Sequence, residues 1–121
     1  MKILLIDDSG LSRNMFKRAL GEEKFSYIEA VDGMSGLEKY LVEKPDLVVL
    51  DLTMPGIYGL EVLGKLRELD SEAKIIIGTA DVQDESRRIA ENLGALGFVT
   101  KPFTSDNIRR EIDRAFGGSW E

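Results

Sequence analysis

The sequence Leu47-Val48-Val49-Leu50-Asp51 is a continuous apolar run that ends on a carboxylate. Continuous runs of this length, rather than alternating ones, are typical of strands buried on both faces of a parallel sheet. Three other segments have the same form of a short apolar run followed by polar residues, namely 3–6 before Asp7-Asp8, 75–77 before Gly78-Thr79, and 98–100 before Lys101-Pro102. We therefore expect four strands with chemically useful side chains at their carboxyl ends.

Helical patterns alternate with these runs. Apolar residues that recur at spacings of three or four mark one face of an α-helix. The sets with this spacing are Leu11, Met15 and Ala19; Leu37, Tyr40 and Leu41; Leu60, Val62, Leu63, Leu66 and Leu69; Val82, Ile89, Ala90 and Leu93; and Ile108, Ile112 and Phe116. We expect five helices, and we expect the partly alternating segment 27–31 to be a fifth, half-buried strand.

Cap and turn residues separate these segments. Ser9 is a predicted helix N-cap and Gly94 a predicted C-cap. Lys44-Pro45-Asp46 should stop the second helix, because the residue before a proline avoids the α region. Asp32-Gly33 and Pro55-Gly56 are typical of a turn and a loop.

Strands that alternate with helices in this way predict an α/β fold with one doubly wound, five-stranded parallel sheet. Continuous apolar runs belong at the centre of such a sheet, and short or alternating segments belong at its edges. Segments 3–6, 47–50 and 75–77 should therefore be central, and 27–31 and 97–100 should be edges. The flavodoxin-like order 2-1-3-4-5, a (βα)5 sandwich, meets this requirement and places the first and third strands side by side at the switch point.

Composition narrows the chemistry. The chain has 121 residues, which suits one domain, and a formal net charge of −6, which argues against a broad basic surface for nucleic acid. It has no Cys and no His, which excludes disulfides, thiolate ligands, histidine acid–base catalysis and the usual zinc sites. The start is too short and too soon acidic for a signal peptide, and no apolar stretch approaches about 18 residues, so we expect a cytoplasmic protein without membrane insertion.

The polar residues that end the runs should share one pocket, because ligands bind just beyond the carboxyl ends of parallel strands. The pocket would contain the carboxylates of Asp7, Asp8 and Asp51, the hydroxyl of Thr79 and the ammonium of Lys101. Clustered carboxylates repel one another unless a cation or protons neutralise them. Oxygen-only ligands favour Mg²⁺, with Mn²⁺ as the alternative. Asp51 is then the candidate nucleophile for a phosphoryl group, with Lys101 and Thr79 contacting the phosphoryl oxygens.

The ordered motifs resemble a known family. Asp7-Asp8, the segment DLTMPG at 51–56, Thr79-Ala80 and the segment KPF at 101–103 occur together as in a CheY-like receiver domain of a two-component response regulator. The resemblance covers essentially the whole chain. We expect a receiver domain at 1–116, followed at 117–121 by a flexible tail, a linker or a cloning remnant.

The resemblance implies a role for each carboxylate. Asp51 accepts a phosphoryl group from a sensor histidine kinase or a phosphotransfer protein. Asp8 binds Mg²⁺ directly and Asp7 mainly through water, while Asp51 and the backbone carbonyl of Thr53 complete the protein ligands. Thr53 and Asp81 flank the phosphoryl site and should tune the approach of the hydrolytic water.

The resemblance also implies a switch. Thr79, Ala80 and Lys101 hold the phosphoryl group, and the Lys101–Pro102 peptide is cis. Thr79 gains a hydrogen bond by moving toward the phosphoryl oxygens, which leaves room for the switch aromatic Phe98 to turn inward. A downstream protein or a second copy then docks on the fourth helix, fifth strand and fifth helix. Such a domain is not a conventional enzyme, although it catalyses its own phosphorylation and autodephosphorylation, and it makes no direct contact with nucleic acid.

Two positions depart from the family pattern. Tyr58 stands before Gly59 where an acidic or amide residue is frequent, and this could alter the loop or a partner surface. Phe98 has no hydroxyl, which weakens the case for a flagellar motor partner, because tyrosine is usual there.

Three other functions share parts of the pattern. A phosphatase of the haloacid dehalogenase type also uses a strand-end Asp, but it needs a second Asp where this chain has Thr53. A flavodoxin has the same sheet order, but Asp7-Asp8 would repel the flavin phosphate. A degenerate receiver that acts only as a docking module would not need the full set of chemical residues.

Overall fold

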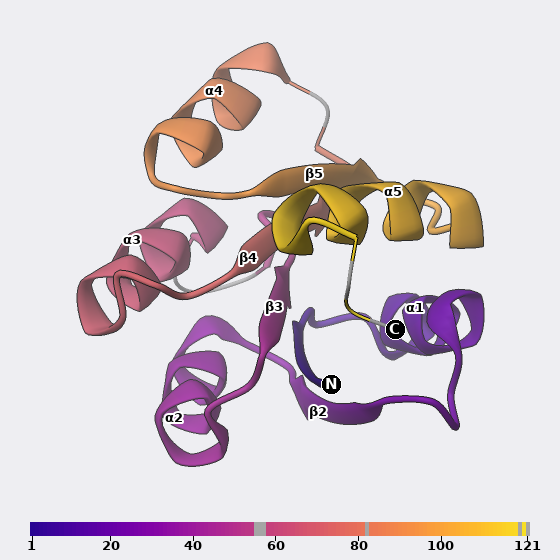
Figure 1. Cartoon of the computed structure of the whole chain (residues 1–121). Coiled ribbons are helices and arrows are strands. Elements are labelled where there is room, and N and C mark those ends of the chain that lie inside the picture. The colour runs from indigo at the N-terminus through magenta and orange to yellow at the C-terminus, as the bar shows by residue number, and fades with distance from the viewer. Residues whose placement is uncertain (55–57, 82, 119, 121) are drawn as a thin grey trace.

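The computed structural model describes residues 1–54, 58–81, 83–118 and 120. Figure 1 shows strands and helices that alternate along the chain. Their bounds are β1 Lys2–Ile6, α1 Gly10–Leu20, β2 Ser26–Ala30, α2 Gly33–Glu43, β3 Leu47–Leu50, α3 Gly59–Leu69, β4 Ile75–Thr79, α4 Asp84–Asn92, β5 Gly97–Thr100 and α5 Ser105–Phe116. The predicted Pro55-Gly56 loop, and Val82 of the predicted fourth apolar set, lie outside the described residues.

The five strands are all parallel and lie in the order β2-β1-β3-β4-β5. This confirms the predicted sheet, with β1, β3 and β4 in the centre. Every residue of β3 and β4 is buried, whereas β2 and β5, at the edges, are partly exposed. Ile6 pairs with Leu50, so the residues that follow β1 and β3 leave the sheet side by side.

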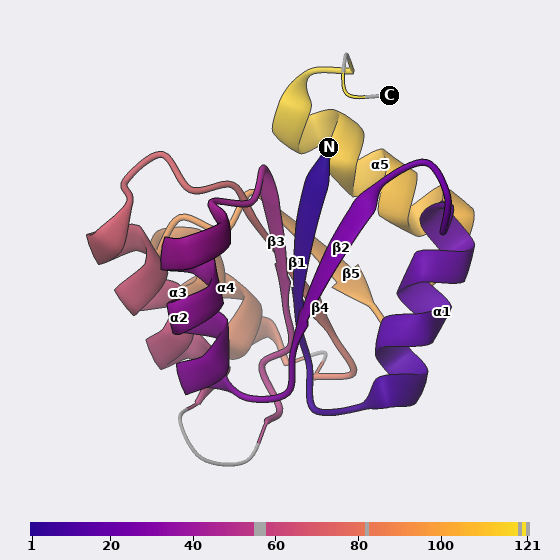
Figure 2. The same ribbon diagram turned by 90° about the horizontal axis from the view of Figure 1, so that it is seen from below.

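Helices cover both faces of the sheet. Figure 2 shows α1 and α5 on one face and α2, α3 and α4 on the other. The apolar side chains of the sheet accordingly divide into two buried clusters, one against each helical layer. The loops beyond the carboxyl ends of the strands are therefore held on a sheet that is packed from both sides.

The buried face of α1 differs from the predicted one. Phe16 and Leu20 are its buried residues, whereas Leu11 of the predicted set is 70% exposed. The prediction started the buried face at Leu11, the first apolar residue of the helix. The face that packs on the sheet is rotated by about one residue, so that Phe16 and Leu20 are buried in place of Met15 and Ala19. In α5, Ile108 and Ile112 are buried as predicted, with Phe116 packed at the edge of the same cluster.

In the other helices, the predicted faces are buried in part, and Val62, Leu63 and Leu66 of α3 are buried as predicted. Leu41 at the end of α2, Leu69 at the end of α3 and Ile89 in α4 are exposed. In α2 and α4 the buried face is a narrow stripe, which passes through Tyr40 in α2 and Ala90 in α4. Apolar residues beside that stripe therefore remain in contact with solvent.

Polar side chains cap the beginnings of α1 and α2. The Ser9 hydroxyl accepts a hydrogen bond from the Ser12 N–H, which confirms the predicted cap of α1. Asp32 caps α2 through the Ser35 N–H, so the predicted Asp32-Gly33 turn is the start of a helix. At the far end of α2, Lys44 adopts a left-handed conformation before Pro45, and the helix ends as predicted.

Trp120 folds back onto the domain. Its ring lies 5.9 Å from that of Phe25 and 5.6 Å from the Arg109 guanidinium, and its Nε1–H donates to the Asp113 carboxylate. The N-terminus and the C-terminal end of α5 lie at the end of the sheet opposite the carboxyl ends of the strands (Figure 2). No helix of the described residues is long and apolar enough to cross a membrane.

Candidate functional site

The carboxyl ends of four neighbouring strands bring the predicted site residues together. Asp7 follows β1, Asp51 follows β3, Thr79 ends β4 and Lys101 follows β5. Carboxylate oxygens of Asp7, Asp8 and Asp51 lie within 4.8 Å of one another. The arrangement follows from the topology, because β1, β3, β4 and β5 are adjacent and end on the same side.

Asp51 is the most enclosed of the three carboxylates, with 2% of its surface exposed. Its Oδ1 accepts three hydrogen bonds, at 3.1 Å from the Thr53 N–H, 3.1 Å from the Thr53 hydroxyl and 2.7 Å from the Thr79 hydroxyl. Its Oδ2 lies 3.2 Å from the Lys101 Nζ. The two oxygens therefore differ, since Oδ1 is held by neutral donors and Oδ2 faces a single ammonium group.

Lys101 connects the two buried carboxylates. Its Nζ lies 2.8 Å from Oδ2 of Asp7 as well as 3.2 Å from Oδ2 of Asp51. Burial alone would lower the pKa of Lys101, but the hydrogen bond to Asp7 and the charge of Asp51 outweigh burial and raise it. The ammonium form is thus favoured at the centre of the site.

The pKa values of Asp51 and Asp7 are shifted in opposite directions. Burial would raise the pKa of Asp51, but the hydrogen bonds from Thr79 and Thr53, together with Lys101, hold it below its ordinary value. Burial raises the pKa of Asp7 above its ordinary value, although hydrogen bonds from Lys101 and the Ser9 N–H oppose this. The polar network therefore keeps Asp51 in the ionised form that a nucleophile requires.

The donor set fits a hard divalent cation. Asp8 is exposed, while Asp7 and Asp51 are buried, so the cluster opens to solvent through Asp8. Oxygen ligands of this kind, with an open side for water, are those that Mg²⁺ binds in phosphoryl-transfer sites. Lys101 partly balances the charge of Asp7 and Asp51, whereas no salt bridge between described residues involves Asp8.

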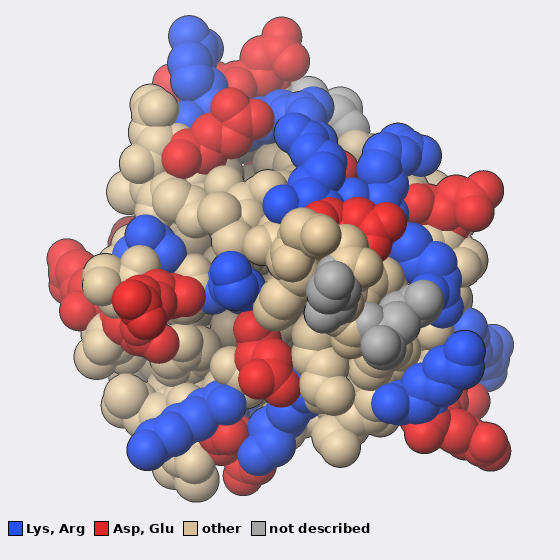
Figure 3. Space-filling model, viewed as in Figure 1, with Lys and Arg blue, Asp and Glu red and all other residues tan. Residues whose placement is uncertain are grey.

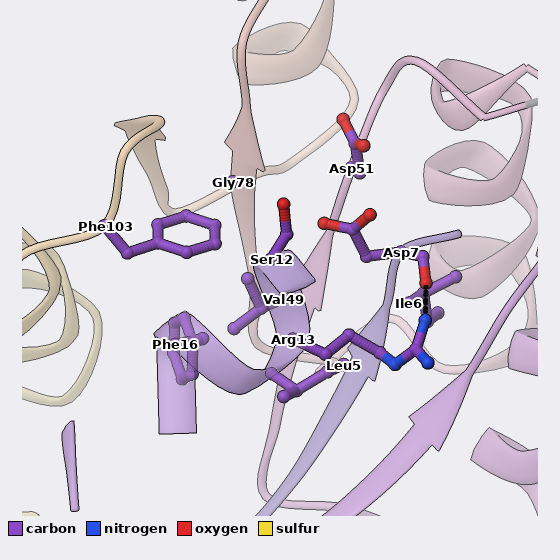
Figure 4. Close-up of a pocket in the computed structure, with 10 residues that line it drawn as sticks. All are labelled: Leu5, Ile6, Asp7, Ser12, Arg13, Phe16, Val49, Asp51, Gly78 and Phe103. Carbon is purple, nitrogen blue, oxygen red and sulfur yellow. Dashed lines mark hydrogen bonds between the residues drawn. The ribbon is translucent and has the colours of Figure 1, made fainter. Parts of the chain in front are cut away.

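Arg13 was missed by the sequence analysis. Figure 4 shows its guanidinium beside Asp7, where Nη1 donates a hydrogen bond of 2.6 Å to the Asp7 backbone carbonyl. The same view shows Phe16 and Phe103 closing the inner wall of the pocket, with ring centroids 5.4 Å apart. A helical arginine carries no sequence signal for this contact, because the contact depends on how α1 lies against the end of β1.

The remaining predicted residues follow β4 and β5 directly in the sequence. Ala80 is exposed directly after β4, and the Asp81 N–H donates a 3.2 Å hydrogen bond to the Thr79 hydroxyl. In this structure, which holds no phosphoryl group, the Thr79 hydroxyl already faces Asp51. The Lys101–Pro102 peptide is cis.

A groove with several arginines runs along the open edge of β5, between α4 and α5. Phe98 is half-buried at its centre, with the Arg87 guanidinium 5.4 Å from its ring. The Phe98 N–H donates a 2.9 Å hydrogen bond to the buried Glu111 carboxylate, which also pairs with Arg114 at 3.0 Å. Figure 3 shows Lys and Arg side chains gathered around α5 on this side of the protein.

The model of the response regulator receiver domain family matches residues 3–113. The chain belongs to the receiver domain family. Chemotaxis protein CheY of Listeria monocytogenes is 35% identical over 116 residues, covering 95% of this chain and 98% of that protein. Sporulation initiation phosphotransferase F of Bacillus subtilis is 33% identical, covering 93% of this chain and 91% of that protein.

Solved receiver structures share the fold. CheY in the CheX-CheY-BeF3-Mg complex of Borrelia burgdorferi aligns with a TM-score of 0.90 at 27% identity, covering 96% of this receiver domain and 89% of that chain. The response regulator TrrA of Thermotoga maritima, in complex with Mg²⁺-BeF, aligns with a TM-score of 0.83 at 35% identity, covering 94% and 97%. The chain is thus a CheY-like receiver, and its family acts in two-component signalling.

Proposed function

We propose that this receiver domain accepts a phosphoryl group on Asp51 in the presence of Mg²⁺, or Mn²⁺ as the alternative. The phosphoryl donor is a sensor histidine kinase or a phosphotransfer protein. The observation that carries the proposal is the buried Asp51 carboxylate, which Thr79 and Lys101 contact and which has Asp7 and Asp8 beside it. The two solved relatives that are complexes with Mg²⁺ and BeF3 or BeF support the metal assignment.

Oδ2 of Asp51 is the attacking atom in this proposal. Oδ1 already accepts hydrogen bonds from Thr53 and Thr79, whereas Oδ2 faces Lys101 and the carboxylate cluster. The new bond joins Oδ2 to phosphorus, the bond from phosphorus to the donor nitrogen breaks, and its electron pair stays on the donor imidazole. Asp8, Asp51 and the Thr53 carbonyl would hold Mg²⁺ directly and Asp7 mainly through water, and the ion would supply neutralisation of charge on the phosphoryl oxygens.

The side chains around Asp51 then stabilise the phosphoryl group. Lys101, which lies beside Oδ2 of Asp51, neutralises negative charge on the phosphoryl oxygens, and the Thr79 hydroxyl donates to a phosphoryl oxygen. Positioning and charge neutralisation of this kind supply most of the rate in phosphoryl transfer. The output passes to a downstream protein or a second copy of the domain through the surface of α4, β5 and α5.

Acetyl phosphate tests this function without a partner kinase. With Mg²⁺, intact-mass measurement should show one added phosphoryl group, and none in chelator. Asp51→Asn should abolish the addition, whereas Asp32→Asn should retain it, because asparagine caps α2 as well as aspartate does. Labelling that persists in Asp51→Asn would contradict the proposal. Absence of labelling in the wild-type protein would favour a docking module, and continuous phosphate release without an acyl phosphate would favour a phosphatase.

A further inference from the structure

We propose that Arg13 is a positioning residue that holds the Asp7–Asp8 segment in the geometry that binds the divalent cation. The inference rests on the proposed metal site. Arg13 lies on the first turn of α1 with 15% of its side chain exposed, and it contacts neither Asp51 nor a carboxylate of the cluster among the hydrogen bonds of the described residues. Its role is therefore exerted through the backbone of Asp7.

Both peptide groups that flank Asp7 are anchored. The Asp7 N–H donates a 3.0 Å hydrogen bond to the Ala30 carbonyl of β2. The Asp7 carbonyl accepts a 2.6 Å hydrogen bond from Nη1 of Arg13. Because this carbonyl belongs to the peptide bond between Asp7 and Asp8, the contact fixes the plane from which the Asp8 backbone and side chain leave.

Arg13 is itself held from the neighbouring strand. Its Nε donates a 2.8 Å hydrogen bond to Oε1 of Glu29, and Oε2 of Glu29 pairs with Lys17 at 3.1 Å. Glu29 lies on β2 directly beside Leu5 of β1. The guanidinium therefore bridges β2 to the end of β1. Its planar arrangement of several N–H donors allows it to make both bonds at once.

The electrostatic and positioning effects of Arg13 have opposite signs. A positive charge close to a cation site weakens cation binding, so loss of charge alone would strengthen Mg²⁺ affinity. Loss of positioning would weaken that affinity, because partners that orient metal ligands typically contribute tenfold or more. The direction of the change therefore separates the two effects.

The experiment measures the Mg²⁺ dissociation constant by NMR titration of backbone amides, well below the melting temperature of each variant. Arg13→Ala should raise the constant by about tenfold. Arg13→Lys keeps the charge but lacks the planar fork by which Nε reaches Glu29 while Nη1 reaches the Asp7 carbonyl, and it should raise the constant by about threefold. Arg18→Ala is the matched control: Arg18 is exposed on the same helix, and its removal should leave the constant unchanged or slightly lower.

The outcomes distinguish this inference from the proposed function. An Arg13→Ala constant equal to or lower than the wild-type value would overturn the inference while leaving the metal site intact. If Arg13→Ala does not fold, Arg13→Lys decides, since wild-type affinity there would overturn the inference. A wild-type protein that binds no Mg²⁺ would overturn both. Weakened binding in both Arg13 variants supports the inference even if acetyl phosphate labels no residue, because the titration requires no phosphorylation.

Discussion

The hydroxyl of Thr79 donates a 2.7 Å hydrogen bond to Oδ1 of Asp51, and both residues are buried. The bond joins the ends of β4 and β3, which are neighbours in the sheet. Thr79 is therefore oriented toward the site before any phosphoryl group arrives. A phosphoryl group would change what the hydroxyl bonds to rather than create its first partner.

Asp8→Ala should remove metal binding without destabilising the metal-free protein. Asp8 is exposed and lies within 4.8 Å of two other carboxylates, so its removal relieves repulsion in the absence of metal. In chelator, the unfolding free energy should stay within about 0.5 kcal/mol of the wild-type value or exceed it. Thermal melts with and without Mg²⁺ measure both effects. A large loss of stability in chelator would show that Asp8 is structural.

Glu29 should contribute stability that disappears in acid. Burial would raise its pKa, but hydrogen bonds from Arg13 and Lys17 lower it below the ordinary value of 4.5. A carboxylate with a lowered folded pKa stabilises the protein above its unfolded pKa, and this contribution is lost as the pH falls through the folded pKa. Urea unfolding of Glu29→Gln should thus show a lower unfolding free energy than the wild-type protein at pH 7, and this deficit should shrink as the pH falls below 4.5. A deficit that is independent of pH would contradict the ion-pair explanation.

The sheet and the site were predictable because their signals are local. The runs 3–6, 47–50 and 75–77 are buried strands as predicted, and the parallel topology alone places Asp7, Asp51 and Thr79 at one edge. A short apolar run between turn residues is typical of a central strand, since both faces of such a strand must be buried.

The helix faces and the supporting contacts were not predictable in the same way. Leu11 fits a helical period yet is exposed, because the period gives a face but not its rotation against the sheet. The bonds of Arg13 to Asp7 and of Glu111 to Phe98 depend on how helices lie on the sheet edges. The contact of Trp120 with Phe25 likewise joins residues far apart in sequence.

Gly59→Ala should destabilise the domain and disturb Asp51. A Cβ at Gly59 would lie 2.4 Å from the Leu52 Cα and 2.6 Å from the Asp51 carbonyl oxygen, and backbone atoms cannot yield as a flexible side chain can. We expect a loss of about 1–3 kcal/mol, together with slower phosphorylation. Gly64→Ala is the control in the same helix, because a Cβ there would meet no atom within 4 Å outside its own helix among the described residues. It should be neutral or stabilising by about 0.5–1 kcal/mol. Urea unfolding measures both variants, and an equal change in unfolding free energy for Gly59→Ala and Gly64→Ala would contradict the steric explanation.

Thr53 and Asp81 should control the lifetime of the phosphorylated state. The Thr53 hydroxyl lies 3.1 Å from Oδ1 of Asp51, and Asp81 follows Thr79 at the mouth of the site. Replacing both with alanine opens the approach of water, and we expect autodephosphorylation to become several-fold faster, which is about 1 kcal/mol in the barrier. Decay of the phosphorylated mass after removal of acetyl phosphate measures this rate. A rate unmoved by either substitution would exclude this role, and an unchanged melting temperature would show that the fold is intact.

Thr79 should transmit phosphorylation to the groove beside Phe98. Phosphorylation adds roughly −1.5 to −2 of charge and new acceptor oxygens, so the Thr79 hydroxyl exchanges Oδ1 of Asp51 for a phosphoryl oxygen. Thr79 pairs with Thr100 in the sheet, two residues from Phe98, so a shift at the end of β4 reaches β5 directly. The half-buried Phe98 ring can then turn inward, which changes the surface that Arg87, Glu111 and Arg114 surround.

Thr79→Ala should accept a phosphoryl group but lose most of the coupling to that surface. A ligand shifts a two-state equilibrium only by its differential affinity, typically about 1–3 kcal/mol, and partner binding must favour beryllofluoride by the same factor. Self-association measured by ultracentrifugation, or the affinity for a partner, should therefore respond to beryllofluoride in the wild-type protein and in Thr79→Ser, which keeps the hydroxyl. The response should fall to a small fraction in Thr79→Ala while intact mass still shows labelling by acetyl phosphate. A full response in Thr79→Ala would mean that the hydroxyl is not the relay, and that the signal leaves Asp51 by another route, such as Lys101 at the end of β5.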